Sequence, residues 1–310
     1  MTEMQMIGFG PWFKFIWKGH ITNWLWRDRL RRRLVRNNAF GEYKMTYLKK
    51  YIPFVKSLKA PAAEATDGEE ARQAFTLWFQ GEENAPEIVK LCLKSIRERF
   101  GDEFTILTDE TLPRYISLPD FITEKWKARK IVPANFSDIV RIELLYQYGG
   151  YWFDATDFLT GDVPEEIRKA PFFMYVTSDK YFPHMFVQTC FMHSVKKDPL
   201  LEMWRKLVHE YWRNEEKACE YFLVHMLLKL LVTHNEEARR LFERMPKLTM
   251  DATHVLWYRT GNLPYDKQMY EEMCRNAFFQ KLSYKKQSKS GVNKILPGSM
   301  ADATINGFRR

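Results

Sequence analysis

The chain has 310 residues, of which 45% are apolar, and its 48 Lys and Arg against 39 Asp and Glu give a formal net charge of +9. This length can form one large core or two modest ones, and the positive charge favours an anionic partner, such as a membrane surface, a nucleic acid or a phosphorylated substrate. No stretch approaches the ~20 apolar residues of a membrane span, and no signal-peptide pattern is present. The four cysteines lie far apart without a CxxC pair, which argues against a zinc site and for reduced cytoplasmic thiols.

Residues 9–36 combine aromatic side chains with a run of arginines, in FGPWFKFIWKGHITNWLWRDRLRRRLVR. Trp, Phe and Ile beside concentrated Arg are typical of the headgroup boundary of an anionic leaflet, which would place the protein at the inner face of the membrane. An equally supported alternative is a helical pair that packs its aromatics on the main domain. Nucleic acid is not expected as a partner, because nothing else resembles a nucleic-acid module. We therefore predict an N-terminal helical extension over 1–59 and a small, acidic linker over 60–71.

After the linker, short apolar runs, the first of which ends in Gly81, alternate with segments of helical periodicity. The predicted strands cover 74–81, 103–110, 151–154, 171–177 and 186–192. The predicted helices cover 85–101, 120–129, 135–148 (with Ser137 as the N-cap and Gly149-Gly150 as the end) and 198–212. Helices then dominate to about residue 245, and residues 287–310 are expected to form a loosely ordered tail. The alternation predicts an α/β fold with a mainly parallel sheet that binds nucleotides at the carboxyl ends of its strands.

Asp154 directly follows the apolar run Tyr-Trp-Phe, which predicts a carboxylate at the tip of a buried strand. Such a carboxylate is costly to bury unless it is paired or bound to a metal. Asp138 and Arg141 lie three residues apart on one helix, where they form either a local salt bridge or a polar clamp beside the strand tip. Trp78, at the end of the first strand, either packs in the core or stacks on a base in the same crevice.

Two longer stretches carry a family resemblance. WFQGEENAPEIVKLCLKSI and ISLPDFITEKWKARKIVPANFSDIVRIELLYQYGGYWFDATDFLTG resemble the capsular polysaccharide synthesis proteins. These belong to a wider group of DXD-containing, glycosyltransferase family 32-like sugar transferases, with yeast-type α-mannosyltransferases and toxin glucosyltransferases. The resemblance covers residues 75–190 well and continues more faintly to about residue 286. It implies a glycosyltransferase-A fold over 72–286, a nucleotide-sugar donor, a glycan or glycolipid acceptor, Mn²⁺ or Mg²⁺, and anomeric retention.

The resemblance also implies roles for individual residues. Trp78 matches the aromatic that stacks on the nucleotide base, and Asp154 matches the first Asp of the DXD motif. The residues that the resemblance implies as contacts to the donor are Trp78, Gln80, Ser137, Asp138 and Arg141. A later segment with His225, Lys281 and Lys285 would close over the diphosphate, although a helical His between apolar residues is more often a core residue.

The expected metal ligands depart from the DXD motif, because Thr156 occupies the position of the second Asp. In a straight strand Asp154 and Thr156 share a side and Asp157 points away, whereas a turn starting at Ala155 would bring Asp157 back as a second metal ligand. Otherwise Asp154 is the main ligand and Asp157 supports the loop.

In the implied reaction, Asp154, Asp138 and Arg141 are the catalytic residues, and the metal and basic groups stabilise the leaving diphosphate. The alternative is a catalytically inactive subunit with the same fold that scaffolds a polysaccharide assembly complex. It is motivated by the threonine at position 156.

Overall fold

The computed structural model describes residues 39–61, 72–177, 186–284 and 295–306. The aromatic and Arg-rich segment 9–36 and most of the predicted linker lie outside these residues. Among the described helices, none combines the length and the apolar character that crossing a bilayer requires. All four cysteines are free thiols, as predicted.

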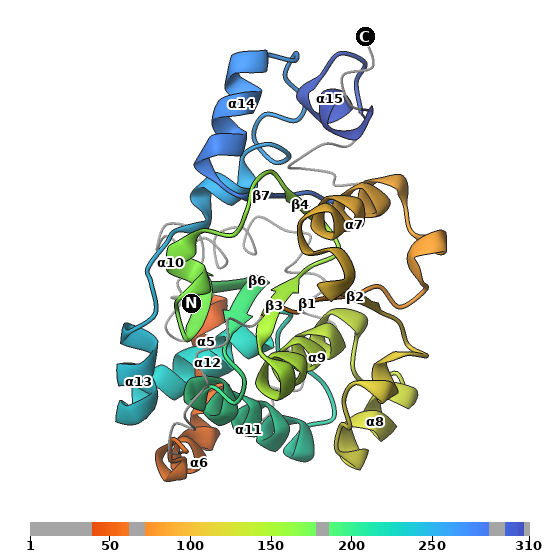
Figure 1. Cartoon of the computed structure of the whole chain (residues 1–310). Coiled ribbons are helices and arrows are strands. Elements are labelled where there is room, and N and C mark those ends of the chain that lie inside the picture. The colour runs from red at the N-terminus through yellow and green to blue at the C-terminus, as the bar shows by residue number, and fades with distance from the viewer. Residues whose placement is uncertain (1–38, 62–71, 178–185, 285–294, 307–310) are drawn as a thin grey trace, which may run out of the picture.

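The described residues form helices and strands in alternation (Figure 1). The helices are α5 (Ala39–Leu48), α6 (Ile52–Ser57), α7 (Glu87–Phe100), α8 (Asp120–Lys127), α9 (Pro133–Tyr148), α10 (Glu165–Arg168), α11 (Pro199–Asn214), α12 (Leu223–His234), α13 (Glu236–Glu243), α14 (Lys267–Asn276) and α15 (Met300–Asn306). The strands are β1 (Ala74–Leu77), β2 (Phe104–Leu107), β3 (Gly150–Phe153), β4 (Asp157–Leu159), β5 (Phe172–Val176), β6 (Val187–Ser194) and β7 (Phe279–Lys281). The predicted α/β class is therefore confirmed, and each predicted strand and helix up to residue 212 is present.

The central sheet has the strand order β2-β1-β3-β6-β5 within the described part of the chain. Strand β1 pairs in parallel with β2 and with β3, whereas β6 runs antiparallel to β3 and to β5. Of these described strands only β6 is reversed, so the sheet is mixed and mainly parallel. As a result, the carboxyl ends of β1, β2 and β3 meet at one edge, and the amino end of β6 lies beside them.

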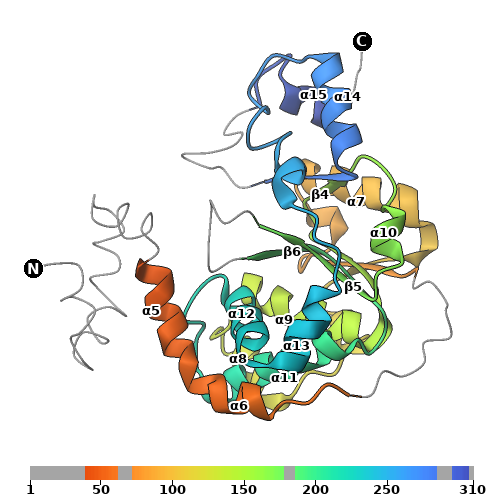
Figure 2. The same ribbon diagram turned by 90° about the vertical axis from the view of Figure 1, so that its left-hand side faces the viewer.

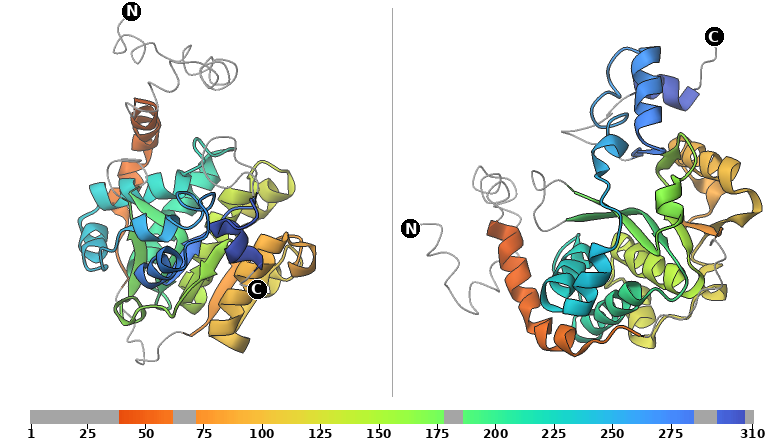
Figure 3. Two further views of the ribbon diagram at one scale, coloured as in Figure 1. Left: turned by 90° about the horizontal axis from the view of Figure 1, so that it is seen from above. Right: turned by 60° about the vertical axis from the view of Figure 1, so that its left-hand side comes forward.

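Helices cover both faces of this sheet (Figure 2). Helices α9 and α12 pack on one face, α11 packs against both of these helices, and α5 and α6 pack against α12. Helix α7 packs with the small sheet β4-β7 on the other face. The described helices at the two ends of the chain, α5 with α6 and α14 with α15, lie at opposite ends of the molecule (Figure 3). Fully buried Trp152, Trp204 and Trp212 fill the main core. Part of the predicted loose tail forms α15 instead, because Met300 and Ala301 are buried in a second, smaller core beside α7.

Helix α9 delivers the chain to β3 through two glycines. It begins at Pro133, so Ser137 lies inside the helix and its prediction as the N-cap is wrong: proline is pre-organised for the first helical position. Gly149 and Gly150 have φ values of +72° and +89°, which end the helix as predicted. A Cβ atom on Gly150 would lie 2.1 Å from the carbonyl oxygen of Gln73. The tight turn therefore requires glycine and sets β3 against the start of β1.

Candidate active site

A cavity of about 910 Å³ opens at the sheet edge where β1 and β3 end. Its lining contains most of the side chains that the sequence singled out, namely Trp78, Gln80, Ser137, Asp138, Arg141, Asp154, Thr156, His225 and Lys281. Asp157 does not line the cavity, and Lys285 lies outside the described residues. The fold thus brings five separate segments of the sequence to one place.

The strand ends explain this convergence. Trp78 and Asp154 directly follow β1 and β3, and parallel strands end at the same edge. The backbone N–H of Asp154 donates to the carbonyl of Cys190 in β6 at 2.8 Å, which fixes the strand tip to the sheet. Asp138 and Arg141 come from α9, which packs against β1 and β3, and Lys281 is the last residue of β7.

The guanidinium of Arg141 is at the centre of a buried polar cluster. Its Nη2 atom lies 3.2 Å from Oδ1 of Asp154 and 3.3 Å from Oδ1 of Asp138. It also donates to the hydroxyl of Ser137, while Nη1 donates to the carbonyl and the hydroxyl of Thr189 and Nε to the carbonyl of Ser137. Every nitrogen of the guanidinium therefore has protein acceptors, and Arg141 organises the two carboxylates.

The two carboxylates beside Arg141 differ in acidity. Burial raises the pKa of Asp138 to about 7, against the lowering effect of Arg141. Burial also acts to raise the pKa of Asp154, but the ammonium of Lys281 and the guanidinium of Arg141 outweigh it, so that this pKa lies below its ordinary value. Near neutral pH, Asp154 is therefore ionised, while Asp138 exchanges between its protonated and ionised forms.

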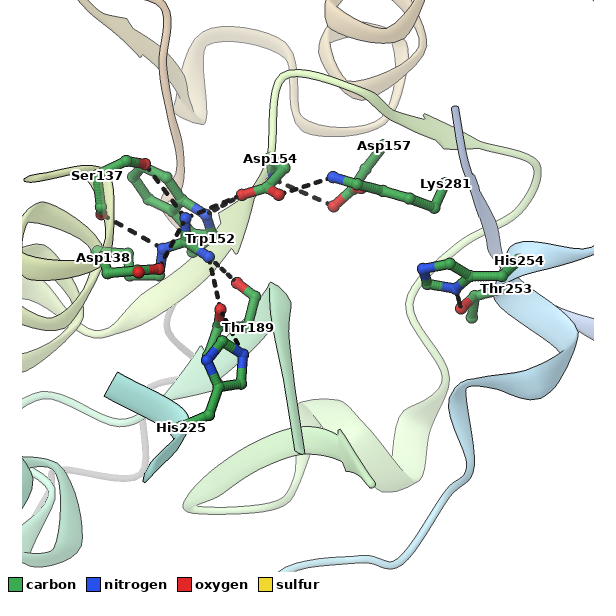
Figure 4. Close-up of polar contacts among 11 residues, drawn as sticks. Ser137, Asp138, Trp152, Asp154, Asp157, Thr189, His225, Thr253, His254 and Lys281 are labelled. Carbon is green, nitrogen blue, oxygen red and sulfur yellow. Dashed lines mark hydrogen bonds and ion pairs between the residues drawn. The ribbon is translucent and has the colours of Figure 1, made fainter. Parts of the chain in front are cut away.

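The ammonium of Lys281 bridges Asp154 and Asp157 (Figure 4). Its Nζ atom donates to Oδ2 of Asp154 at 2.7 Å and to Oδ1 of Asp157 at 3.0 Å. Lys281 and Asp157 are direct cross-strand partners in the β4-β7 pair. Although burial acts to lower the pKa of Lys281, the two carboxylates raise it above its ordinary value, so this side chain stays charged.

The chain turns between Asp154 and Asp157, as one of the two alternatives predicted. The N–H of Asp157 donates to the carbonyl of Asp154 at 2.9 Å, and Oδ2 of Asp157 accepts the N–H of Asp154 at 3.1 Å. This turn brings both carboxylates to one ammonium. However, the side chain of Asp157 is fully buried behind the cavity wall.

In this arrangement Asp154 and Asp157 do not fit a divalent cation. Each of their four oxygens already accepts a protein N–H: Trp152 and Arg141 contact Oδ1 of Asp154, and Lys281 stands between the two carboxylates. Across the described ranges, no three His, Cys, Asp or Glu side chains converge as metal ligands would. A requirement for Mn²⁺ or Mg²⁺ stays a prediction.

Part of the cavity wall is aromatic. The half-buried ring of Trp78 lines it, and its buried indole N–H has no hydrogen-bond acceptor among the described residues. Buried donors are nearly always paired, so this N–H points to a ligand acceptor. Tyr284 meets the Trp78 ring edge-on at 5.3 Å. Trp78 also packs against the smaller core, so the predicted packing role is observed, and base stacking stays a prediction.

These residues occur in a sequence with clear relatives. A profile of the capsular polysaccharide synthesis proteins matches residues 31–300, most of the chain. The chain belongs to this family. It is also similar to the O-glycosyltransferase PaGT of Phomopsis amygdali, with 24% identity over 196 residues, which are 57% of this chain and 47% of that protein. The chain thus spans about half the length of this curated relative.

A solved structure, the PaToxG glycosyltransferase, covers 70% of this chain and 86% of its own with 14% identity and a TM-score of 0.36. Membership of the capsular polysaccharide synthesis family, predicted from the residues, is confirmed. The narrower assignments, to a glycosyltransferase family 32-like group and to a DXD metal motif, stay predictions.

Sequence reasoning missed several residues of the site in this family member. Thr189 holds Arg141, and it went unnoticed because it is a polar residue inside an apolar strand segment. Trp126 also lines the cavity, stacks on Phe136 at 4.1 Å, and donates its indole N–H to Asp109 at 3.2 Å. The cavity mouth also carries exposed tyrosines, Tyr221 and Tyr284, which are 55% and 44% exposed. Both occur in the segments that carried the fainter part of the resemblance.

His225 lies in the cavity wall on α12 (Figure 4). Its Nε2 atom is 3.3 Å from the hydroxyl of Thr189, and its Nδ1 atom has no partner in the described structure. Burial, followed by the nearby charge of Arg141, lowers the pKa of His225 from 6.5 to about 3. The ring is therefore neutral in the folded protein, as a core histidine would be.

This neutral histidine predicts an acid-sensitive stability. Between pH 6.5 and 3 the unfolded chain takes up a proton at His225 that the folded chain does not, so the free energy of unfolding falls as pH falls through this window. We expect that fall to be less steep in His225→Leu. Urea titrations at pH 7.0, 5.5 and 4.5 measure the slopes, with His234→Leu, at a half-buried histidine whose pKa burial also lowers, as the comparison. Equal slopes in wild type and His225→Leu would show that this histidine is protonated in the folded state.

Proposed function

We propose that the chain is a glycosyltransferase with a glycosyltransferase-A type fold. It would move a sugar from a nucleotide-sugar donor to a glycan or glycolipid acceptor during surface polysaccharide synthesis. The observation that carries the proposal is the cluster of Asp154, Arg141 and Lys281 at a strand tip, inside a cavity that the ring of Trp78 also lines. The family and the name of the relative PaGT support it.

The cavity suits the parts of a nucleotide sugar. Its volume, about 910 Å³, is in the range of small-molecule sites. Trp78 offers a ring face for a base and an unpaired N–H for an acceptor atom. The ammonium of Lys281 suits the diphosphate, because Lys acts as a point charge toward phosphate. Asp138 and Asp154 then face the sugar, whose hydroxyls donate to carboxylates.

The proposed chemistry follows from this placement. Breaking the bond between sugar and diphosphate produces an anionic leaving group and an oxocarbenium-like sugar. Lys281 stabilises the first and the carboxylate of Asp154 the second, as fixed charges in a site of low dielectric. His225 is too weak a base at neutral pH to accept the acceptor's proton. In the proposed retaining reaction, the leaving phosphate accepts that proton.

The acceptor would enter past the exposed ring of Tyr221 at the cavity mouth. Aromatic rings at such positions provide stacking surfaces for sugars. A glycolipid acceptor would agree with a peripheral membrane contact through residues 9–36, which lie outside the described structure. This contact is part of the proposal.

Trp78→Ala is expected to weaken nucleotide binding by about 1–3 kcal/mol, the usual contribution of a base stacked on an aromatic ring. Calorimetric titration of nucleoside diphosphates measures the loss, and thermal unfolding shows whether the variant folds. Trp257→Ala, which removes a buried ring of the same core away from the cavity lining, is the matched control. If both variants lose stability and both bind normally when folded, Trp78 is a packing residue only.

A panel of nucleotide sugars tests the proposed function. One donor should raise the unfolding temperature of the protein, and the same donor should be hydrolysed slowly or transferred to an acceptor glycan. Binding of a donor without hydrolysis or transfer would instead favour the inactive scaffolding subunit. If no donor binds, the proposal is wrong.

A further inference from the structure

We infer that Lys281 provides, as part of the protein, the positive charge that the predicted divalent cation would provide, so that the diphosphate binds without a metal. The inference rests on the proposed function and states how the proposed active site recognises the nucleotide-sugar donor. It arises from a disagreement: the residues expected to hold a cation are already bridged by an ammonium.

The strand pairing fixes Lys281 in this position. Lys281 is the register partner of Asp157 in the β4-β7 pair, and the next residue, Leu282, donates its N–H to the carbonyl of Thr156 at 2.8 Å. The carboxylate of Asp157 is fully buried, and among the described cations it contacts only Lys281. Removing one partner of a buried ion pair is strongly destabilising. Asp157 therefore holds the ammonium in place.

The held ammonium still faces the ligand space. Lys281 lines the cavity, its side chain is 14% exposed, and Asp157 lies behind it. An ammonium has three N–H donors, of which the contacts to Asp154 and Asp157 use two. No other side chain or carbonyl of the described residues accepts from this ammonium, so the third donor is available to an acceptor in the cavity. A phosphate oxygen is the strongest acceptor that a donor substrate offers.

A divalent cation would have to displace this ammonium. Mg²⁺ requires about six oxygen ligands, but of the two acidic side chains only Asp154 lines the cavity, and both of its oxygens accept protein donors. The positive charges of Lys281 and Arg141, both in contact with Asp154, would repel the incoming cation. Lys281 therefore takes the place of the cation in this site.

Binding of nucleoside diphosphates tests the inference without an acceptor. We would titrate UDP, GDP, CDP and ADP into the full chain by calorimetry, once in excess EDTA and once with Mn²⁺. The affinity of the nucleotide that binds should agree within about twofold between the two conditions, a difference below half a kcal/mol. Lys281→Met should lose at least about tenfold in both conditions, the loss of one charge-assisted hydrogen bond, and Lys281→Arg should lose less.

Lys125→Met is the matched control. Its ammonium is equally buried, with a 12% exposed side chain in an ion pair with Glu216, but it does not line the cavity. The affinity of the Lys125→Met variant for the nucleotide should equal that of wild type. If Lys281→Met does not fold, the wild-type comparison in EDTA and Mn²⁺ and the Lys281→Arg variant decide.

Two outcomes would overturn the inference in different ways. Binding that appears only with Mn²⁺ would show that the diphosphate needs a metal in addition to Lys281, while the proposed function stands. Absence of binding in both conditions would overturn the proposed function together with the inference.

Discussion

Asp154→Asn is expected to lower the rate of sugar transfer by at least about a hundredfold, in line with the loss of one preorganised electrostatic group. The asparagine keeps the size of the side chain and an oxygen for Arg141, but it removes the charge that faces the sugar. Its amide would also place a donor against the ammonium of Lys281, which now contacts Oδ2 at 2.7 Å. Initial rates with the donor found in the panel measure the effect.

The fold should survive this change. The side chain of Asp154 is 27% exposed at a strand tip, and Lys281 keeps Asp157 as its counterion. Thermal unfolding of the same samples checks this, and Asp162→Asn, which changes a 90% exposed carboxylate, is the neutral control. Turnover near that of wild type in Asp154→Asn would remove the central claim about the site.

Asp157→Asn provides a useful contrast to Asp154→Asn. Its carboxylate does not line the cavity, so its effect on transfer should be the smaller of the two and should act through Lys281. Its effect on stability should be the larger, because the side chain is fully buried and leaves the ammonium with one partner. The two variants therefore separate Asp154, which is proposed to contact the substrate, from Asp157, which positions Lys281.

Much of the fold followed from local patterns. Short apolar runs and helical periodicity predicted the elements of the α/β layer, because each pattern depends on residues within one segment. The reversed direction of β6 was not predictable in this way, since strand direction is set by pairing across the sheet. The short β4-β7 pair joins residues 157–159 to residues 279–281, and segments of three residues carry no periodicity.

The site shows the same division. The position of Asp154 after an apolar strand was enough to place it at the ligand edge of the sheet. The contacts of Arg141 were not, because its acceptors on Thr189 come from β6, whose direction the sequence left open. In a straight strand, the alternation of side chains predicts that Asp157 points away from Asp154. The turn between the two residues instead brings both carboxylates to Lys281. The sequence was thus enough to predict which residues reach this edge of the sheet. The ion pairs that these residues form depend on the register between distant strands.

Gly150→Ala is expected to lower the free energy of unfolding by more than about 3 kcal/mol, which combines the cost of a strained backbone with that of overpacking. Gly150 has a φ of +89°, which L side chains rarely adopt, and its added Cβ would lie 2.1 Å from the carbonyl oxygen of Gln73. That carbonyl accepts the N–H of Tyr151 at 2.8 Å, so it cannot move away without breaking the contact between β3 and the start of β1.

Gly298→Ala separates strain from overpacking. Gly298 has a similar φ of +74°, but no heavy atom lies within 4 Å of the position that an added Cβ would take, so only the backbone cost of about 1–3 kcal/mol applies. Urea unfolding with linear extrapolation measures both variants. The larger loss in Gly150→Ala should come with weaker nucleotide binding by the folded fraction, because a shift of β3 against β1 moves Asp154 relative to Trp78. Equal losses in the two variants would show that the contact with Gln73 relaxes freely, and that the paired glycines matter only for the turn.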